Sequence, residues 1–314
     1  MPVELPLVSI VTPSFNQARF LEQTIQSVLG QDYPNLEYLV VDGSSTDGSL
    51  GIIQKYANRI DWWVSEPDHG QAEAINKGLC RAKGDYVAWL NSDDIYLPGA
   101  INQAIATFTQ HPSVGLVYGN VLAMDENGQT TNLLRYGIWS LLDLMSFRVI
   151  GQPSVFMRRS ILEQVGTLDT SYHYLLDHQL WLRMAQITEF CYIPIKLSGA
   201  RFHPAAKNVS RAAEFGREAY RILEWMDTQP ILVPIMQKNR KRIQAGAHRL
   251  SAYYLLEGNQ PINALSEYSR GFLLHPGTIL QDWKRISYAF ICLLGLNRLG
   301  NIYRRLQRRF YRNS

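Results

Sequence analysis

The stretch Tyr86-Val-Ala-Trp-Leu-Asn-Ser-Asp-Asp94 decides the fold of this chain. Its apolar first half, Tyr86 to Leu90, predicts a short buried strand, which the polar second half ends abruptly. In an open α/β sheet, ligands bind outside the carboxyl ends of the strands. Mg²⁺ and Mn²⁺ prefer carboxylate oxygens and complete their shell with substrate phosphates. The stretch therefore predicts either a divalent ion that holds a diphosphate, or a strand-end turn whose Asn and Asp cap the next helix.

The composition is that of a globular protein with one large or two moderate domains. The chain has 314 residues, of which 46% are hydrophobic and 18% charged, and this argues against disorder. Its three cysteines lie far apart without a CxxC pair, which argues against a disulfide framework or a zinc cluster and suits a reducing cytoplasm. We expect no signal peptide and no membrane-spanning helix, because the first residues lack a basic region and no apolar run reaches ~18–20 residues.

Strands and helices alternate along the first part of the chain, and each predicted strand ends in polar residues. The predicted strands are 7–11, 36–41, 60–65, 86–90, 114–118 and 152–157. An Asn-Gly turn at Gly128 predicts a hairpin. The alternation predicts an α/β fold with a mostly parallel, doubly wound, Rossmann-like sheet. The polar strand ends would share one edge of that sheet, which is the predicted site.

The common phosphate-binding loops are missing from the sequence. It has no GxG and no GxxxxGK[ST], so a bound nucleotide would have to be held by a metal ion and side chains. Asp177 begins a predicted helix over residues 175–184. An Asp at that place is a helix cap or first-turn dipole partner, or alternatively a general base at the helix N-terminus.

Five groups of residues occur in a fixed order along the chain. They are Val8–Asn16, Val40–Gly48, the block Ala74–Gly78 with Gly84-Asp85 and Asn91–Asp94, Gln152–Phe156, and Asp177–Arg183. Together they resemble the motifs of the family 2 glycosyltransferases, inverting enzymes of the GT-A fold, over about residues 5–205. The resemblance implies a GT-A type catalytic domain over residues 1–207, followed by an all-helical extension over residues 208–314.

The resemblance assigns a first group of residues to the nucleotide side of the donor. Pro13 and Phe15 would border the nucleobase, and Asp42 would lie near the base or the ribose. Asp68 and Asn76 would lie close to the donor.

A second group is assigned to the metal and the chemistry. Asn91 would be the first, neutral oxygen of the acidic motif, Asp93 would ligate Mn²⁺ or Mg²⁺, and Asp94 would orient the sugar. Asp177 would be the base that deprotonates the acceptor hydroxyl. His203 resembles a distal histidine that can reach the metal or the diphosphate, although a lone histidine is more often structural.

Two positions depart from the family pattern. Gly43 follows Asp42 where many members have a second acid, and the acidic motif begins with Asn91 in place of Asp. We expect altered base or ribose contacts from the first departure and a modest change in metal affinity from the second.

The resemblance implies a metal-dependent hexosyltransferase of the inverting type. It would move one sugar from a nucleotide-diphosphate sugar to a hydroxyl of a glycan or lipid-linked acceptor, in bacterial cell-surface polysaccharide biosynthesis. The Gln-x-x-Arg-Trp motif of the processive members is absent, so addition of a single sugar is favoured over polymerisation. The alternative is a non-catalytic scaffold protein of the same fold that binds a sugar nucleotide or a glycan.

The C-terminal third predicts helices and a basic end. Residues 250–276 resemble one tetratricopeptide-type hairpin, which cannot bury its own faces and so should pack on neighbouring helices. Residues 281–314 carry eight Lys and Arg against Asp282 alone, interleaved with apolar residues. Residues 287–296 suit an interfacial helix at an anionic membrane surface, which would place the protein at the cytoplasmic face of the plasma membrane. A docked basic last helix is the alternative, and a nucleic-acid arm fits less well.

Overall fold

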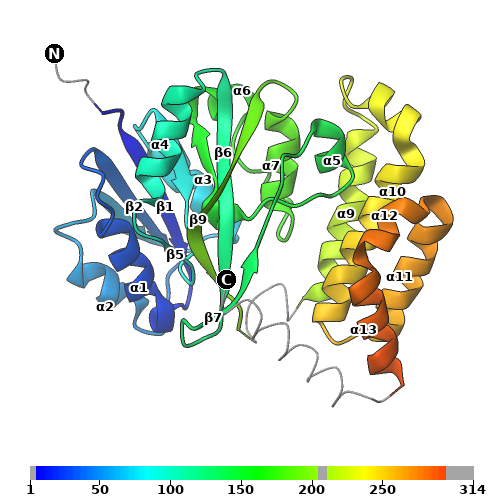
Figure 1. Cartoon of the computed structure of the whole chain (residues 1–314). Coiled ribbons are helices and arrows are strands. Elements are labelled where there is room, and N and C mark those ends of the chain that lie inside the picture. The colour runs from blue at the N-terminus through cyan, green and yellow to red at the C-terminus, as the bar shows by residue number, and fades with distance from the viewer. Residues whose placement is uncertain (1–4, 204–210, 295–314) are drawn as a thin grey trace. The chain divides into compact units, whose positions relative to one another are not determined.

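The computed structural model describes residues 5–203 and 211–294, and the chain divides into two compact units. The first unit comprises Met1–Ile138 and Ile150–Arg201, and the second comprises Trp139–Val149 and Phe202–Ser314. The first unit carries the sheet, whereas the second is helical (Figure 1).

Four parallel strands form one half of the sheet, in the order β3-β2-β1-β4. They are β1 (Val8–Ser14), β2 (Leu36–Asp42), β3 (Trp62–Ser65) and β4 (Tyr86–Trp89). Each is a short apolar run with β-branched or aromatic side chains, which suits a strand buried on both faces. The predicted parallel sheet is confirmed for this half.

Helices cover both faces of these strands. They are α1 (Ala18–Leu29), α2 (Ser49–Lys55), α3 (Gln71–Arg81) and α4 (Ala100–Gln110). On one face, Ile25 of α1 and Phe108 of α4 share an apolar core with Ile10 of β1. On the other face α3 packs so closely that a Cβ on Gly78 would lie 2.3 Å from a methyl of Val11. The sheet is therefore doubly wound, as predicted.

The other half of the sheet is mixed, with the order β8-β6-β9-β5 and β7 beside β6. These strands are β5 (Ile95–Tyr96), β6 (Val114–Met124), β7 (Thr130–Leu134), β8 (Phe156–Arg158) and β9 (Glu189–Arg201). β6 and β7 form the predicted hairpin, and Gly128 in its turn has φ +79°. β9 pairs parallel with β6 and was not predicted. The parallel arrangement thus holds for one half of the sheet only.

Two predicted strand boundaries differ in the structure. Residues 152–154 form the 3₁₀ turn η1 (Gln152–Ser154), and the strand begins only at Phe156. The hydroxyl of Ser154 stabilises this turn, because it donates to carbonyl oxygens of Gly151 and Gly119. β3 begins at Trp62, since Asp61 uses its carboxylate to accept the backbone N–H of Tyr38 at 2.8 Å.

The remaining helices of the first unit follow β8. They are α6 (Arg159–Val165) and α7 (Leu176–Met184). Trp181 of α7 stacks on Trp89 of β4 with ring centroids 5.4 Å apart, and both rings are fully buried. This stack fixes α7 beside the strand that leads into the acidic motif.

The second unit is a group of antiparallel and crossing helices. They are α5 (Leu141–Met145), α9 (Ala212–Met226), α10 (Val233–Glu257), α11 (Pro261–Leu274), α12 (Pro276–Ile279), the 3₁₀ turn η2 (Leu280–Asp282) and α13 (Trp283–Leu293). The predicted hairpin is the end of α10 with α11, where Leu256 and Tyr268 are buried together. Ile279 of α12 and Ala289 of α13 complete that core, so this pair of helices packs on its neighbours.

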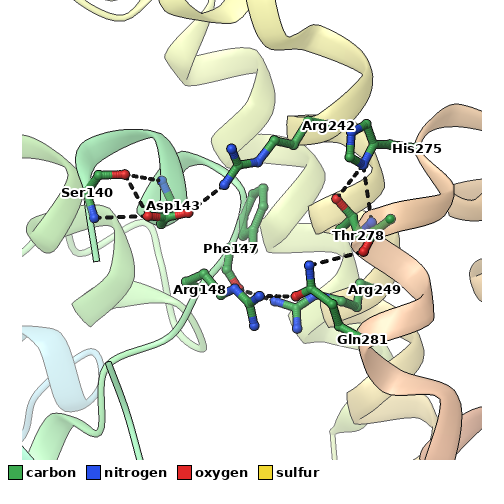
Figure 2. A network of polar contacts seen from close by, with 10 residues as sticks. Ser140, Asp143, Phe147, Arg148, Arg242, Arg249, His275, Thr278 and Gln281 are labelled. Atoms are coloured by element: carbon green, nitrogen blue, oxygen red, sulfur yellow. Dashed lines mark hydrogen bonds and ion pairs between the residues drawn. The ribbon is translucent and has the colours of Figure 1, made fainter. Parts of the chain in front are cut away.

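Residues 139–149 join the helical unit although they lie between β7 and η1 in the sequence. Ser140 and Asp143 form a reciprocal cap at the start of α5 (Figure 2). Asp143 also pairs with Arg242 of α10 at 2.5 Å, and Arg249 donates to the carbonyl of Phe147 at 3.1 Å. The sequence places the domain boundary at residue 207, whereas the contacts also assign this inserted segment to the second unit.

No helix within residues 5–203 and 211–294 is long and apolar enough to cross a membrane. The first part of the predicted basic tail is α13, and residues 295–314 lie outside the described residues.

Candidate functional site

The carboxyl ends of three parallel strands meet at one edge of the sheet. Ser14 of β1, Asp42 of β2 and Ser65 of β3 lie side by side in register. The acidic motif follows the fourth strand directly, after Leu90, whose N–H donates to the carbonyl of Val11 at 2.9 Å. The first unit therefore brings the polar strand ends together, as the alternation predicted.

The Asp42 carboxylate organises the turn that follows β2. It is fully buried and accepts hydrogen bonds from the Ser45 N–H at 2.9 Å, the Ser45 hydroxyl at 2.5 Å and the Ser65 hydroxyl at 2.7 Å. Three donors to one buried carboxylate make a rigid turn. The predicted contact of Asp42 with the base or the ribose stays a prediction.

A second carboxylate holds the start of α1 against the same turn. Asp47 accepts the N–H of Ala18 at 2.8 Å and the hydroxyl of Ser49 at 2.6 Å. Burial alone would raise the pKa of Asp47, but these hydrogen bonds outweigh it, and the pKa is lowered. Pro13 is buried in β1, whereas the Phe15 ring is 60% exposed beside this turn.

Gly43 has no room for a side chain. A Cβ at this position would lie 2.6 Å from Oδ2 of Asp68 and 3.3 Å from the ring of Phe15. The other oxygen of Asp68 accepts the N–H of Gly70 at 2.9 Å, which fixes the carboxylate. The departure from the family pattern at Gly43 thus leaves space that the Asp68 carboxylate fills.

The two acids of the central motif have different surroundings. Asp94 is buried, and its carboxylate accepts the backbone N–H of Arg201 at 3.0 Å, while Asp93 is half-buried. Burial raises the pKa of the Asp94 carboxyl well above its usual range, and the charge of Asp93 adds to the rise. Hydrogen bonds from Arg201 and Asn91 oppose it. A cation close to both acids would relieve the repulsion.

Asn91 belongs to a chain of side-chain amides. Its oxygen accepts from Gln71 at 2.7 Å, and its Nδ2 donates to Gln152 at 3.2 Å and lies 3.5 Å from Oδ2 of Asp94. Gln152 in turn donates to the carbonyl of Trp89 at 2.8 Å. The chain ties α3, the end of β4 and η1 together, and it gives the Asn91 oxygen a protein partner.

Asn76 supports the loop before α7. Its Nδ2 donates to the carbonyl of Leu168 at 2.8 Å, and its oxygen accepts the N–H of Leu168 at 2.9 Å. Both ends of the amide therefore hold the backbone of a residue 92 positions away in sequence. The structure gives Asn76 a structural role, and its predicted contact with the donor stays a prediction.

Asp177 lies in the first turn of α7 but does not cap the helix. The cap position is Leu175, which makes no side-chain capping bond. Asp177 is half-buried and accepts the N–H of His178 at 2.7 Å. The Trp89–Trp181 stack fixes the helix that carries it. Of the two structural alternatives, a helix cap and a first-turn partner of the helix dipole, the structure shows the first-turn position.

Arg201 is the residue that the sequence analysis missed. It ends β9, is 4% exposed, and donates from Nε to the carbonyl of Asp93 at 2.9 Å. The only signal in the sequence is its place two residues before His203. His203 is buried and falls in the second unit, so its role as a ligand stays a prediction.

The acidic motif suits a divalent ion that shares its shell with a substrate. Within the described residues, no group of three or more His, Cys, Asp and Glu could hold a metal ion by itself. Mg²⁺ and Mn²⁺ sites commonly use one or two carboxylates and complete the shell with water and substrate phosphates. The half-buried Asp93 beside the buried Asp94 fits such a shared site.

The fold is that of the GT-A glycosyltransferases. The chain is similar to TarS 1–349 of S. aureus, with a TM-score of 0.60 and 16% identity, over 98% of this chain and 92% of that one. It is also similar to the mannosyltransferase PcManGT of Pyrobaculum calidifontis, solved with GDP-Man and Mn²⁺. That match has a TM-score of 0.61 and 20% identity, over 92% of this chain and 86% of the other. The predicted fold class is confirmed.

The family model of glycosyl transferase family 2 matches residues 9–166, which is half of the chain. The chain belongs to this family, as the motifs predicted. TuaG of Bacillus subtilis, named for teichuronic acid biosynthesis, is 34% identical over 168 residues, covering 52% of this chain and 65% of TuaG. An O-antigen biosynthesis protein of Myxococcus xanthus, RfbC, is 30% identical over 58% of this chain and 15% of its own length. The chain spans 30%, 65% and 34% of three Rickettsia relatives, which are uncharacterized glycosyltransferases.

Proposed function

We propose that this protein is a metal-dependent, inverting glycosyltransferase. It moves one sugar from a nucleotide-diphosphate sugar to a hydroxyl of a glycan or lipid-linked acceptor, in cell-surface polysaccharide biosynthesis. The observation that carries the proposal is the edge of the sheet that bears both the Asp42 turn and the Asp93-Asp94 motif, at the carboxyl ends of the strands on either side of β1. The names of TuaG and RfbC support the polysaccharide, and the complexes of TarS with UDP-GlcNAc and of PcManGT with GDP-Man support the donor class.

The nucleotide binds over the ends of β1, β2 and β3 in this proposal. Phe15 offers an exposed ring for stacking on the base, and the rigid Asp42 turn together with Asp68 offers acceptors for the base and the ribose. Asp93 holds a divalent ion at the diphosphate, Asp94 orients the sugar, and His203 is the further candidate ligand. The ion, when bound, neutralises the charge that grows on the leaving diphosphate.

Asp177 acts as the general base. It takes the proton of the acceptor hydroxyl while the oxygen of that hydroxyl forms a bond to the anomeric carbon. The bond from this carbon to the diphosphate breaks at the same time, and the diphosphate leaves with the electron pair. Attack from the opposite face inverts the configuration, so no covalent intermediate is needed. A hydrogen bond from the His178 N–H at 2.7 Å orients the carboxylate of Asp177 for this role.

Nucleotide-sugar binding tests the donor site. We would titrate UDP-, GDP- and dTDP-sugars by calorimetry, with and without Mn²⁺, into the wild-type protein and Asp93→Ala. Manganese-dependent binding of one nucleotide class, lost in Asp93→Ala, is expected. Asp85→Ala is the matched control, because Asp85 is exposed and precedes β4 at the opposite end of the same strand. Absence of binding by the wild-type protein with every donor and Mn²⁺ would refute the proposal.

Hydrolysis of the donor tests the base. Asp177→Asn should keep the donor affinity of the wild-type protein and lose the slow transfer of the sugar to water, at least about 100-fold. NMR of the released sugar should show the inverted anomer first. Retention of configuration would refute the inverting mechanism while leaving the donor site intact.

A non-catalytic scaffold is the second candidate. The observation that favours it is the Asn91 oxygen, which accepts a hydrogen bond from Gln71 at 2.7 Å and so has one lone pair left for a metal ion. A scaffold would bind the sugar nucleotide equally well in the wild-type protein and in Asp177→Asn, and neither would release the sugar. The hydrolysis experiment therefore separates the two functions.

We also propose that the helical unit holds the protein at the cytoplasmic face of an anionic membrane. Trp283 and Phe290 lie on one face of α13 and Leu294 follows its last residue; the three are 60%, 52% and 71% exposed. Lys284 lies beside them, with Nζ 5.7 Å from the ring of Trp283. Residues 295–314 add six arginines and no acid. Aromatic and apolar side chains among basic ones are typical of interfacial helices.

Vesicle sedimentation tests this surface. The full chain should bind vesicles that contain phosphatidylserine and lose binding as salt rises, because each basic residue contributes ~1 kcal/mol near such a surface. Phe290→Asp and a chain that ends at Leu294 should each bind at least about 5-fold more weakly. Ile262→Asp is the control, since Ile262 of α11 is also exposed, at 66%, but lies outside this face. Equal binding by all four proteins would refute the membrane proposal.

A further inference from the structure

One buried arginine, Arg201, joins three segments of the first unit at the acidic motif. Its Nε donates to the carbonyl of Asp93 at 2.9 Å, and its backbone N–H donates to Oδ1 of Asp94 at 3.0 Å. Its Nη2 donates to Oε1 of Gln23 in α1 at 2.8 Å. Its Nη1 lies 3.4 Å from the carbonyls of Asp125 and Glu126 in the turn between β6 and β7.

The guanidinium group of Arg201 is fixed by an aromatic ring and by its hydrogen-bond acceptors. Its carbon lies 4.7 Å from the centre of the Phe20 ring, which covers one face of the plane. The side-chain acceptors described for Arg201 are neutral oxygens, two of them carbonyls of the β6–β7 turn. The Arg19–Glu126 pair, at 3.0 Å, ties that turn to α1 independently. These contacts connect the backbone of the acidic motif to α1 and to the β6–β7 turn.

The positive charge of Arg201 also acts on Asp94, where it offsets part of the repulsion from the charge of Asp93. Because its bonds go to the Asp93 carbonyl and the Asp94 side chain, it orients the backbone of the motif. A ligand needs such fixed support, since supporting residues around a metal site set the direction in which the ligand points.

We propose that Arg201 is a positioning residue, which holds the Asp93-Asp94 backbone in the conformation that binds the donor's metal–diphosphate. This inference rests on the proposed function. It predicts that Arg201 contributes to the affinity for Mn²⁺ in the presence of nucleotide, and contributes little to the affinity for nucleotide alone.

Replacement of Arg201 tests the inference by direct binding. Calorimetry would measure Mn²⁺ binding to the protein saturated with UDP or GDP, whichever binds the wild-type protein. Arg201→Met keeps an unbranched stem over Phe20 and removes every guanidinium donor. We expect it to weaken Mn²⁺ binding by about 10–100-fold, as loss of a supporting partner of a metal ligand commonly does. Arg201→Lys keeps the charge and one donor group, so it should restore part of the affinity.

Arg158→Met is the matched control. Arg158 also ends a strand, lies over the rings of Tyr86 and Phe108, and donates to the carbonyl of Pro112 at 3.1 Å. It pairs with Tyr86 at the start of β4, at the opposite end from the acidic motif. Its loss should lower the melting temperature and leave Mn²⁺ binding as in the wild-type protein.

The outcomes separate the two proposals. If the wild-type protein binds Mn²⁺ with nucleotide and Arg201→Met binds it equally well, the positioning role is refuted and the proposed function stands. If Arg201→Met does not fold, Arg201→Lys and Gln23→Leu take its place, because Gln23→Leu removes one acceptor and leaves the buried charge. Wild-type affinity in both of these would refute the role as well. No nucleotide binding by the wild-type protein would refute the proposed function, and the inference with it.

Discussion

Asn91→Asp should destabilise the first unit although the two side chains have the same shape. In the wild-type protein Nδ2 of Asn91 donates to Gln152 at 3.2 Å and lies 3.5 Å from Oδ2 of Asp94. A carboxylate oxygen in that place faces two acceptors and adds a charge beside a buried acid. At 3.5 Å and an effective dielectric constant of ~20, two unit charges repel by roughly 4–5 kcal/mol. Uptake of a proton limits the loss, so we expect about 2–3 kcal/mol at pH 8.

The loss should depend on pH in a known direction. Burial and Asp93 already raise the pKa of Asp94 in the folded protein, and a further carboxylate raises it more. A raised pKa means that the folded state binds a proton more tightly than the unfolded chain, so stability falls as the pH rises through the carboxyl range. The difference between Asn91→Asp and the wild-type protein should therefore be smaller at pH 5 than at pH 8. Binding of Mn²⁺ together with nucleotide should also reduce this stability difference at pH 8.

Thermal melts at both pH values measure this effect. A loss of 2–3 kcal/mol corresponds to a shift of about 4–12 °C for a unit of this size. Asn102→Asp is the matched control, because Asn102 donates to the carboxylate of Asp32 at 2.7 Å in an exposed place, where a surface pair contributes ~1 kcal/mol or less. If Asn91→Asp and Asn102→Asp have the same melting temperature at pH 8, the hydrogen bonds of Asn91 do not stabilise the first unit as we infer.

Three further predictions concern other parts of the chain. Gly43→Ala should displace the Asp68 carboxylate and weaken nucleotide binding, measured by calorimetry, whereas Gly51→Ala, with nothing within 4 Å of its Cβ, should bind normally. Trp181→Ala should cost about 3–5 kcal/mol in urea unfolding, because a large, fully buried ring is removed; a loss under 1 kcal/mol would contradict this packing. Glu267 is buried, which would raise its pKa, but hydrogen bonds outweigh burial and lower it, so its stabilising effect should vanish as the pH falls below about 4.5. Glu267→Gln should therefore flatten the acid limb of the stability curve, and an unchanged limb would contradict the assignment.

The parallel half of the fold could be predicted because its signal is local. β1, β2 and β4 are apolar runs that end in polar residues, and each is buried on both faces. β9 gives no such signal, since Pro194 interrupts it and its middle is exposed at Ile195 and Lys196. Its strand conformation comes from pairing with β6, a partner distant in sequence.

The placement of two acidic residues at strand ends could be predicted for the same reason. Asp42 ends β2 and Asp93 comes four residues after β4, so the position of each at a strand end was readable from the sequence. The partners of Asn91 and Arg201 were not, because they lie up to 178 residues away and only the folded chain brings them together. The space at Gly43 for the Asp68 carboxylate is likewise a property of the packed turn.

The segment 139–149 limits how this chain can be divided or recombined. It leaves the sheet after β7, joins the helical unit through Asp143 and Phe147, and returns to the sheet at η1. A single cut near residue 207 would therefore remove Arg242 and Arg249 from the segment 139–149 and leave Asp143 and the Phe147 carbonyl without these partners. An exchange of the helical end between relatives would have to carry two separate pieces of the gene. The helical unit should accordingly be inherited together with the sheet.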